Sequence, residues 1–156
     1  MWAAKGIRPV RIVSGKRGKK ENTVVFGAID IDGRQIFRQY DSFNGKTFLD
    51  FMKKMHKKYR KLYLFLDRAS EHYVTKEVRK YMRRNRKTLR VRWIPVGCPE
   101  FNMMEECWKE GENDLSSLPK FPTTKKELKG ILAKYYRTRK FSNLHMDKFL
   151  LTNRCL

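Results

Sequence analysis

The stretch "LYLFLD", from Leu62 to Asp67, decides how this chain folds. Its first five residues form an apolar run that ends abruptly at a carboxylate. Such a run is typical of a central strand that is covered on both faces, and strands of this kind are usually parallel to a neighbour. We therefore predict a central parallel strand whose carboxyl end is marked by Asp67.

The segments on either side of this strand indicate an α/β domain with a mixed sheet. Upstream, alternating residues around an Asp32-Gly33 turn predict a hairpin with strands near 23–31 and 35–40. Downstream, a further strand is expected near 89–94. Helical periodicity and capping residues predict four helices: 46–59, 75–84, one that begins after Pro99-Glu100 and is capped by Gly111, and one that opens with a Thr124-x-x-Glu127 capping box.

The composition limits what the protein can be. A chain of 156 residues with 40% hydrophobic residues fits one folded domain, 1–156, whose first 22 or so residues are a basic loop. The 37 Lys and Arg residues exceed the 16 Asp and Glu residues, and the net charge of +21 makes a polyanion the expected partner. We find no apolar run of membrane-spanning length and no signal peptide, so we expect a cytoplasmic protein.

The three cysteines and three histidines show no metal-binding spacing. Cys98, Cys107 and Cys155 are odd in number and are interpreted as reduced thiols. His56 and His145 are expected to be surface or packing residues, and Trp93 and Trp108 are expected to lie in the core.

Two acidic positions are candidates for a metal site. Asp67 lies at the carboxyl end of a central strand, where functional groups gather in α/β sheets. Glu105 lies on the helix that follows the next strand, so both carboxylates can reach the same edge of the sheet. Paired carboxylates suit Mg²⁺, which takes part in phosphoryl transfer on nucleic acids. The alternative is that Asp67 caps the next segment and that the Glu105-Glu106 pair is solvated surface.

Two longer segments carry a family resemblance. "LYLFLDRASEHYVTKEV" and "VRWIPVGCPEFNMMEECW" resemble the second and third catalytic blocks of DDE transposases from prokaryotic insertion sequences related to mariner elements. "MWAAKGIRP" and "VVFGAIDIDGR" resemble the Trp-x-x-x-Gly segment and first hairpin of that family. The resemblance implies a ribonuclease H-like mixed sheet flanked by helices, with Mg²⁺- or Mn²⁺-dependent DNA strand cleavage and strand transfer.

The resemblance also assigns residues. It implies that Asp67 and Glu105 are catalytic acids and metal ligands, that Glu106 is a neighbour, and that His72, Asn102 and Trp108 support the site. The first catalytic Asp of the family precedes the Trp-x-x-x-Gly segment, which here begins at Trp2, so we expect an N-terminally truncated domain that lacks this Asp and the region that binds transposon ends. Asp30 and Asp32 are weak substitutes for it. We expect the central strand position to be filled either by "RPVRIV" (8–13) or by another chain, such as an upstream transposase half or a second copy.

Basic residues provide the expected contacts to DNA, both transposon ends and target. They lie on the N-terminal loop and in the stretch "RKYMRRNRK": Lys16, Arg17, Lys19, Lys20, Arg83 and Arg84. For any one of them, a solvated surface position is the alternative. At the level of the whole chain, the alternative to a transposase catalytic domain is a non-catalytic, basic DNA-binding remnant of one.

Overall fold

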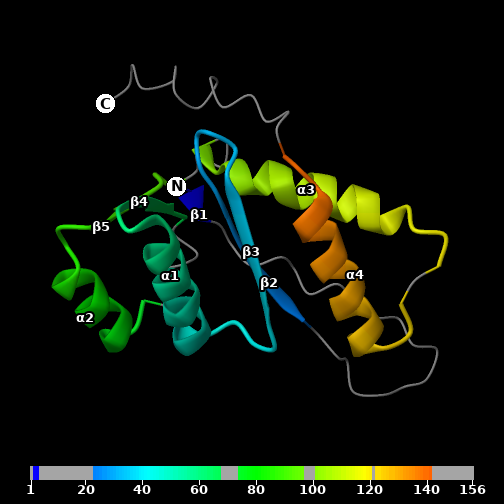
Figure 1. The fold of residues 1–156 in the computed structure, drawn as a ribbon, viewed down its shortest axis with the longest axis horizontal. Coiled ribbons are helices and arrows are strands. Elements are labelled where there is room, and N and C mark those ends of the chain that lie inside the picture. The colour runs from blue at the N-terminus through cyan, green and yellow to red at the C-terminus, as the bar shows by residue number, and fades with distance from the viewer. Residues whose placement is uncertain (1, 4–22, 68–73, 97–100, 121, 142–156) are drawn as a thin grey trace.

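A five-stranded mixed sheet flanked by four helices makes up the part of the chain that the computed structural model describes, residues 2–3, 23–67, 74–96, 101–120 and 122–141 (Figure 1). The strands are β1 (Trp2–Ala3), β2 (Val24–Ile29), β3 (Gln35–Tyr40), β4 (Leu62–Leu66) and β5 (Leu89–Trp93). The helices are α1 (Gly45–Tyr59), α2 (Lys76–Arg84), α3 (Met103–Ser116) and α4 (Lys125–Thr138). The predicted hairpin, both later strands and all four helices are therefore present.

The strand order is β3-β2-β1-β4-β5. The β2–β3 hairpin is antiparallel, β1 pairs antiparallel with β2 and parallel with β4, and β4 pairs parallel with β5. The predicted parallel pairing of the "LYLFLD" strand is thus confirmed, and β5 lies at the edge of the sheet.

The central position between β2 and β4 differs from the sequence-based expectation. Trp2–Ala3 occupies part of it, with Trp2 opposite Ile29 and Phe65, and Ala3 opposite Ala28 and Leu66. The first residues of the chain thus supply backbone groups to both neighbouring strands over these two rows, a placement that the sequence analysis did not predict. The segment 8–13 lies outside the described residues.

The expectation that β4 is covered on both faces holds only in part. Leu62, Leu64 and Leu66 are buried on one face; on the other face Tyr63 is 48% exposed, whereas Phe65 is half-buried against the core that α3 and α4 form. The main contacts of α3 and α4 are with β1, β2 and β3, so among the described residues they cover Phe65 but not Tyr63.

The alternation of side chains along β2 divides the core into two layers. Phe26 and Ala28 face α1 and belong to a core with Phe51 and Leu64. Residues on the other face of β2, such as Val25 and Ile29, belong to a second core with residues of α3 and α4, which include Trp108, Leu128 and Leu132. The mixed sheet thus separates a layer formed by α1 and α2 from a layer formed by α3 and α4 (Figure 1).

Glycine determines how α3 packs at two points. An added Cβ at Gly27 of β2 would lie 2.5 Å from Met104 Cε and 2.7 Å from Trp108 Cη2, so the missing side chain lets α3 approach the sheet. The prediction that Gly111 caps α3 was wrong, because the helix continues to Ser116. Gly111 lies inside it against α4, where an added Cβ would be 2.7 Å from the Tyr136 hydroxyl.

Polar side chains cap the helices that flank the sheet. Asn44 and Thr47 form a reciprocal capping box at the start of α1. At α4, Thr124 accepts a hydrogen bond from the Glu127 N–H, as predicted, but the Glu127 carboxylate accepts from the Thr123 N–H instead of the Thr124 N–H.

Among the described residues, no helix combines the length and apolar character that crossing a membrane requires.

Candidate active site

The carboxyl ends of β4 and β5 form the edge at which the predicted acidic site would lie. Asp67 follows β4 directly and is half-buried. The Ile94 N–H donates a 2.7 Å hydrogen bond to the Leu66 carbonyl oxygen, so the chain leaving β5 stays against the end of β4. This pairing fixes the position of Asp67 relative to the segment that leads into α3.

Asn102 joins Asp67 to the beginning of α3. Its side chain is buried, and its Oδ1 accepts a hydrogen bond of 3.3 Å from the Met104 N–H as the N-cap of the helix. Its Nδ2 lies 3.5 Å from Asp67 Oδ2, a long donor contact. One amide group therefore uses its acceptor for the helix and its donor for the carboxylate. Two residues that are 35 positions apart in the sequence thus meet at one edge of the sheet.

The two adjacent glutamates of α3 lie in different environments. Glu105 is the third residue of the helix and is half-buried, whereas Glu106 is exposed and forms a 2.8 Å ion pair with Lys109. Both carboxylates lie in the first turn, where the partial positive charge of the helix N-terminus stabilises negative charge. The sequence-based interpretation, in which Glu105 belongs to the site and Glu106 is its solvated neighbour, is consistent with this difference in exposure.

Trp108 lies one turn further along α3, in the core, as predicted. Its ring packs edge-on against Phe37 and Tyr136, with centroid separations of 5.8 and 5.9 Å, and its Nε1 has no hydrogen-bond partner among the described residues. It anchors α3 to β2 and β3, and so it fixes the helix that carries Glu105. Trp93 was expected to lie in the core as well, but it is only half-buried, because its strand forms the edge of the sheet.

Asp30 does not join this site. It accepts hydrogen bonds from the N–H groups of Asp32 and Arg34, and its Oδ2 forms a 2.7 Å ion pair with Arg34 Nε. The strand register places Asp30 three rows from Asp67, a distance of about 10 Å along the strands. Asp30 therefore organises the hairpin turn rather than substituting for a catalytic acid.

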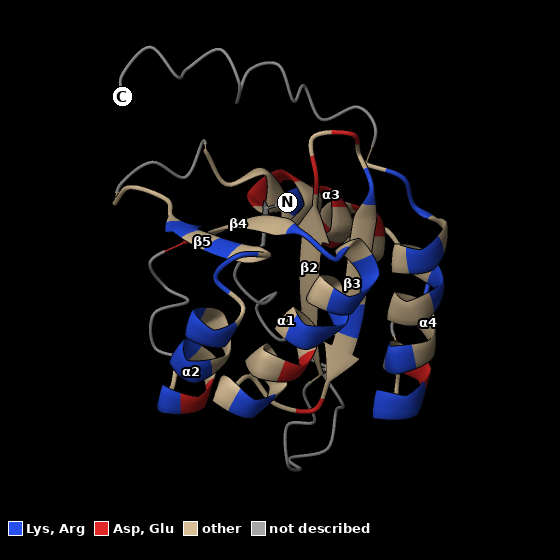
Figure 2. Cartoon of the chain, turned by 60° about the vertical axis from the view of Figure 1, so that its left-hand side comes forward, with Lys and Arg blue, Asp and Glu red and all other residues tan. Residues whose placement is uncertain are grey.

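The predicted basic residues fall into two groups. Lys16, Arg17, Lys19 and Lys20 lie outside the described residues, as do His72, His145, Cys98 and Cys155. Arg83 and Arg84 are exposed on α2, and Figure 2 shows Lys and Arg residues along α1, α2, α4 and β5. Arg83 lines a hollow beside β5, and Arg84 does not.

Sequence reasoning missed Arg79 and Arg86, which line the same hollow. Arg79 and Arg83 are four residues apart and so share one face of α2, which the periodicity of "RKYMRRNRK" could have identified, whereas Arg86 lies in the turn after the helix.

The other predicted packing residues are confirmed where they are described. The ring nitrogens of His56 lie 2.8 Å from the Tyr81 hydroxyl and 2.9 Å from Thr88 Oγ1, so His56 joins α1 to α2 and to the turn before β5. Cys107 is a free thiol in the core, and its burial raises its pKa to about 12. Neither side chain has the environment of a catalytic group.

Asp67 and Glu105 are oxygen donors of the kind that a hard divalent cation prefers. Mg²⁺ binds oxygen ligands and often takes only one or two protein carboxylates, which Asp67 and Glu105 could supply. Asn102 already bonds one oxygen of Asp67, which holds the carboxylate in place. Within the described ranges, however, no group of three or more His, Cys, Asp or Glu side chains is arranged to hold a metal ion.

Comparison with protein families identifies the class of protein to which this chain belongs. The mixed sheet between two helical layers confirms the predicted α/β class of fold, a mixed sheet flanked by helices. The model of the DDE superfamily endonuclease family matches residues 1–129, and the chain belongs to that family.

No curated protein matches the chain. Among solved structures, it is similar to a chain in the cryo-electron microscopy structure of the simian T-cell lymphotropic virus intasome in complex with the PP2A regulatory subunit B56 gamma. The two share 14% identity with a TM-score of 0.45, and the match covers 97% of this chain and 45% of that one.

Proposed function

We propose that this chain is the catalytic portion of a DDE transposase from a mariner-like prokaryotic insertion sequence and that it acts in DNA strand cleavage and strand transfer. Asp67 and Glu105 are its acidic metal ligands. The observation that carries the proposal is the contact between Asn102 Nδ2 and Asp67 Oδ2, which brings the end of β4 to the start of α3, where Glu105 lies.

Each residue of the site has a separate role in this proposal. Asn102 holds the Asp67 carboxylate in one orientation, and the buried Trp108 holds α3 against the sheet so that Glu105 stays at the edge. His72 supports the same edge. When bound, Mg²⁺ or Mn²⁺ would activate an attacking oxygen and stabilise a leaving one, the attacking group being water or a DNA 3′-hydroxyl.

The substrate in this proposal is DNA, at transposon ends and at the target, in the cytoplasm. The net charge of +21 supports binding to a phosphate backbone, with Lys16, Arg17, Lys19, Lys20, Arg83 and Arg84 as contacts. The proposed partners besides DNA are an upstream transposase half and a second copy of this chain.

Metal binding by the purified chain tests the assignment of the two acids. Isothermal titration with Mn²⁺, and then with Mg²⁺, should detect a site in the parent chain that is lost in Asp67→Asn and in Glu105→Gln. Glu106→Gln is the matched control, because it neutralises the exposed neighbour on the same helix turn and should leave the site intact. Circular dichroism checks that all variants fold. Equal losses in Glu105→Gln and Glu106→Gln would contradict the assignment.

A second candidate function is that of a non-catalytic, basic DNA-binding remnant. It is favoured by the finding that the described residues contain no group of three or more acidic, His or Cys side chains able to hold a metal. Metal-dependent nicking of supercoiled plasmid separates the two candidates. Nicking that is lost in Asp67→Asn supports the transposase, whereas salt-sensitive DNA binding without metal binding or nicking supports the remnant.

A further inference from the structure

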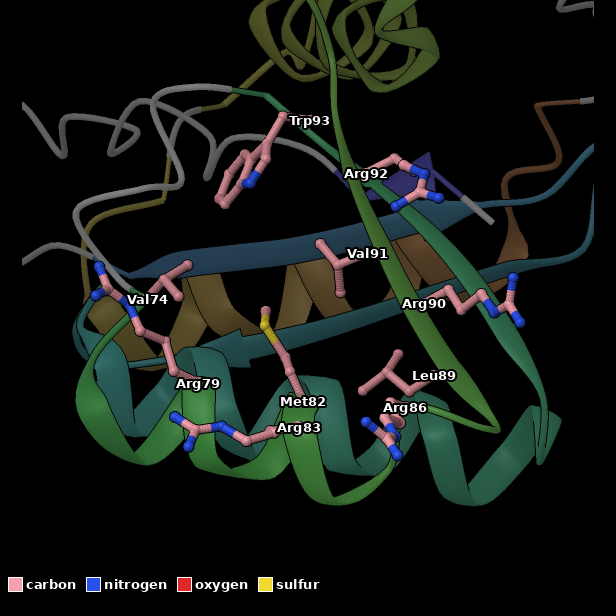
Figure 3. A pocket seen from close by; sticks show the side chains of 10 residues that line it. All are labelled: Val74, Arg79, Met82, Arg83, Arg86, Leu89, Arg90, Val91, Arg92 and Trp93. Carbon is pink, nitrogen blue, oxygen red and sulfur yellow. The ribbon is translucent and has the colours of Figure 1, made fainter.

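A hollow of about 690 Å³ lies between α2 and the edge strand β5. Figure 3 shows α2 along one side of it and β5 along the other. Its lining consists of five arginines and five apolar residues: Val74, Arg79, Met82, Arg83, Arg86, Leu89, Arg90, Val91, Arg92 and Trp93. Among the described residues no acidic side chain lines it, so the charge of this lining suits an anion.

The positive charge inside the hollow comes from α2 and the turn after it. Arg79, Arg83 and Arg86 are exposed along that side, and none of them forms an ion pair with another described residue. Arg90 and Arg92 contribute less positive charge to the hollow, because side chains alternate along β5. Figure 3 shows both of their guanidinium groups turned away from α2. Three basic side chains that are exposed to solvent therefore lie along one wall of the hollow.

The floor of the hollow is apolar. Met82, Val91 and Trp93 are each half-buried there, and in Figure 3 the Trp93 indole projects into the open space at one end. In duplex DNA the faces of the bases are already stacked on one another, so an apolar floor adds little to the binding of a duplex. A single strand exposes its bases, which can stack on an aromatic ring while its phosphates meet basic side chains.

The hollow begins beside the candidate active site. Trp93 is the last residue of β5 and is paired with Leu66, the residue before Asp67. From there the hollow follows β5 back to Leu89, a length of five residues or about 16 Å. A strand held in it would thus have one end at the edge where Asp67 lies.

We propose that this hollow binds a single-stranded DNA segment, with Arg79, Arg83 and Arg86 on its phosphates and Trp93 stacked on a base. The inference rests on the proposed function, because strand cleavage at the Asp67 edge would free such a segment there. The open edge of β5 could instead accept an acidic peptide as an added strand. The three arginines on the opposite wall and the stacking surface of Trp93 favour nucleic acid.

The test compares labelled single-stranded oligothymidine with a duplex of the same length, by fluorescence anisotropy on the full chain. In Arg79→Gln/Arg83→Gln/Arg86→Gln, single-strand affinity should fall at least tenfold, and the slope of log affinity against log salt should decrease by about 2. The matched control removes three exposed charges from α4, Lys126→Gln/Lys134→Gln/Arg137→Gln, and should lose much less. Circular dichroism confirms that both variants fold.

Trp93 supplies the second measurement. Trp93→Leu should weaken single-strand binding about tenfold and leave duplex binding unchanged, and Trp93→Phe should restore part of the loss, because a phenyl ring still stacks. Equal losses of single-strand affinity in the triple-arginine variant and in the α4 control variant would overturn the inference. Equal effects of Trp93→Leu on single-strand and duplex binding would overturn it as well. The inference would also be overturned, in favour of a peptide partner, if oligoglutamate binding depends on the same three arginines and single-stranded DNA binding does not.

The outcome also separates this inference from the proposed function. One outcome is that the chain binds duplex DNA, and binds metal at Asp67 and Glu105, while its single-strand binding does not depend on Arg79, Arg83 and Arg86. This outcome leaves the proposed function standing and rejects the hollow as a DNA site. A parent chain that binds neither form of DNA rejects both.

Discussion

At the scale of single residues, the most informative positions are those where one side chain, or its absence, fixes two elements at once. Asn102 caps α3 with its oxygen and contacts Asp67 with its nitrogen, so replacing it would affect the helix start and the carboxylate together. Gly27 has the complementary role, because the space left by its missing side chain is filled by Met104, Phe37 and Trp108. Both residues position α3, and with it Glu105, against the sheet.

The packing of α3 predicts opposite effects for two glycine substitutions. Gly27→Ala should lower the free energy of unfolding by about 1–3 kcal/mol, since its Cβ would lie 2.6 Å from Phe37 Cε1 and 2.7 Å from Trp108 Cη2. Gly130→Ala in α4 should raise it by about 0.5–1 kcal/mol, because nothing lies within 4 Å of the added Cβ and alanine favours helix. Urea denaturation of the two variants and the parent measures both. An unchanged stability of Gly27→Ala would mean that α3 packs less closely than described.

At the scale of elements, the attachment of α4 to the sheet depends on polar contacts as well as on its apolar face. Leu128 and Leu132 pack into the core, while Lys125 and Lys129 both reach Asp41, just after β3, at 2.9 and 2.7 Å. At the other end of α4, the Tyr135 hydroxyl donates to Asp114 of α3, a bond of 2.7 Å. The helix is thus tied to both β3 and α3, which fixes the layer that carries the candidate site.

The contacts of Asp41 predict a pH dependence. The hydrogen bonds from Lys129 and Lys125 lower the pKa of Asp41 to about 2. A carboxyl group whose pKa is lower in the folded state adds stability above its unfolded pKa of about 4, and this contribution is lost as the pH falls through about 2. Since Asp41 is exposed, we expect the contribution to be small.

NMR titration of the Asp41 carboxyl carbon measures this pKa directly. The midpoint should lie near 2 in the parent and should return to about 4 in Lys125→Gln/Lys129→Gln. The stability difference between the parent and Asp41→Asn should be present near neutral pH and absent in strong acid. A midpoint near 4 in the parent would show that the lysines do not hold Asp41 in solution.

At the scale of the whole molecule, an excess of positive charge surrounds two apolar cores. Figure 2 shows basic residues on the outer faces of α1, α2 and α4, whereas acidic residues are concentrated on α3. With a net charge of +21, the folded chain repels itself, and this repulsion opposes compactness even where local ion pairs form. Binding of a polyanion would relieve the same repulsion.

The net charge predicts that salt stabilises this protein. Raising NaCl from about 50 mM to about 500 mM shortens the range of charge interactions and should raise Tm, by about 2–4 °C for each kcal/mol gained. Differential scanning calorimetry of the parent measures the shift. The variant Lys126→Gln/Lys134→Gln/Arg137→Gln, with three fewer charges, should show a smaller shift. A Tm that does not change, or that falls with salt, would show that self-repulsion is not a significant cost.

The sequence alone predicted the β2–β3 hairpin, β4, β5 and the four helices, and it named the residues of the candidate site. The apolar run 62–66, the Asp32-Gly33 turn and the helical periodicities are local patterns, and each produced the predicted element. The order of Asp67 and Glu105 along the chain predicted a common edge, because crossover connections bring the carboxyl ends of parallel strands together. These features depend on neighbours in sequence or on general rules of chain connection.

Only the tertiary structure decided which surfaces are covered and where the elements meet. Trp2–Ala3 pairs with β2 and β4 in the central position, Tyr63 is exposed, Gly111 lies inside α3, and five arginines line the hollow beside β5. Each of these depends on contacts between segments far apart in the sequence, such as Gly111 with Tyr136 of α4, and local patterns carry no record of such contacts. The periodicity of a helix indicates that it has a buried face, but the shapes of the packed side chains determine which strand that face covers.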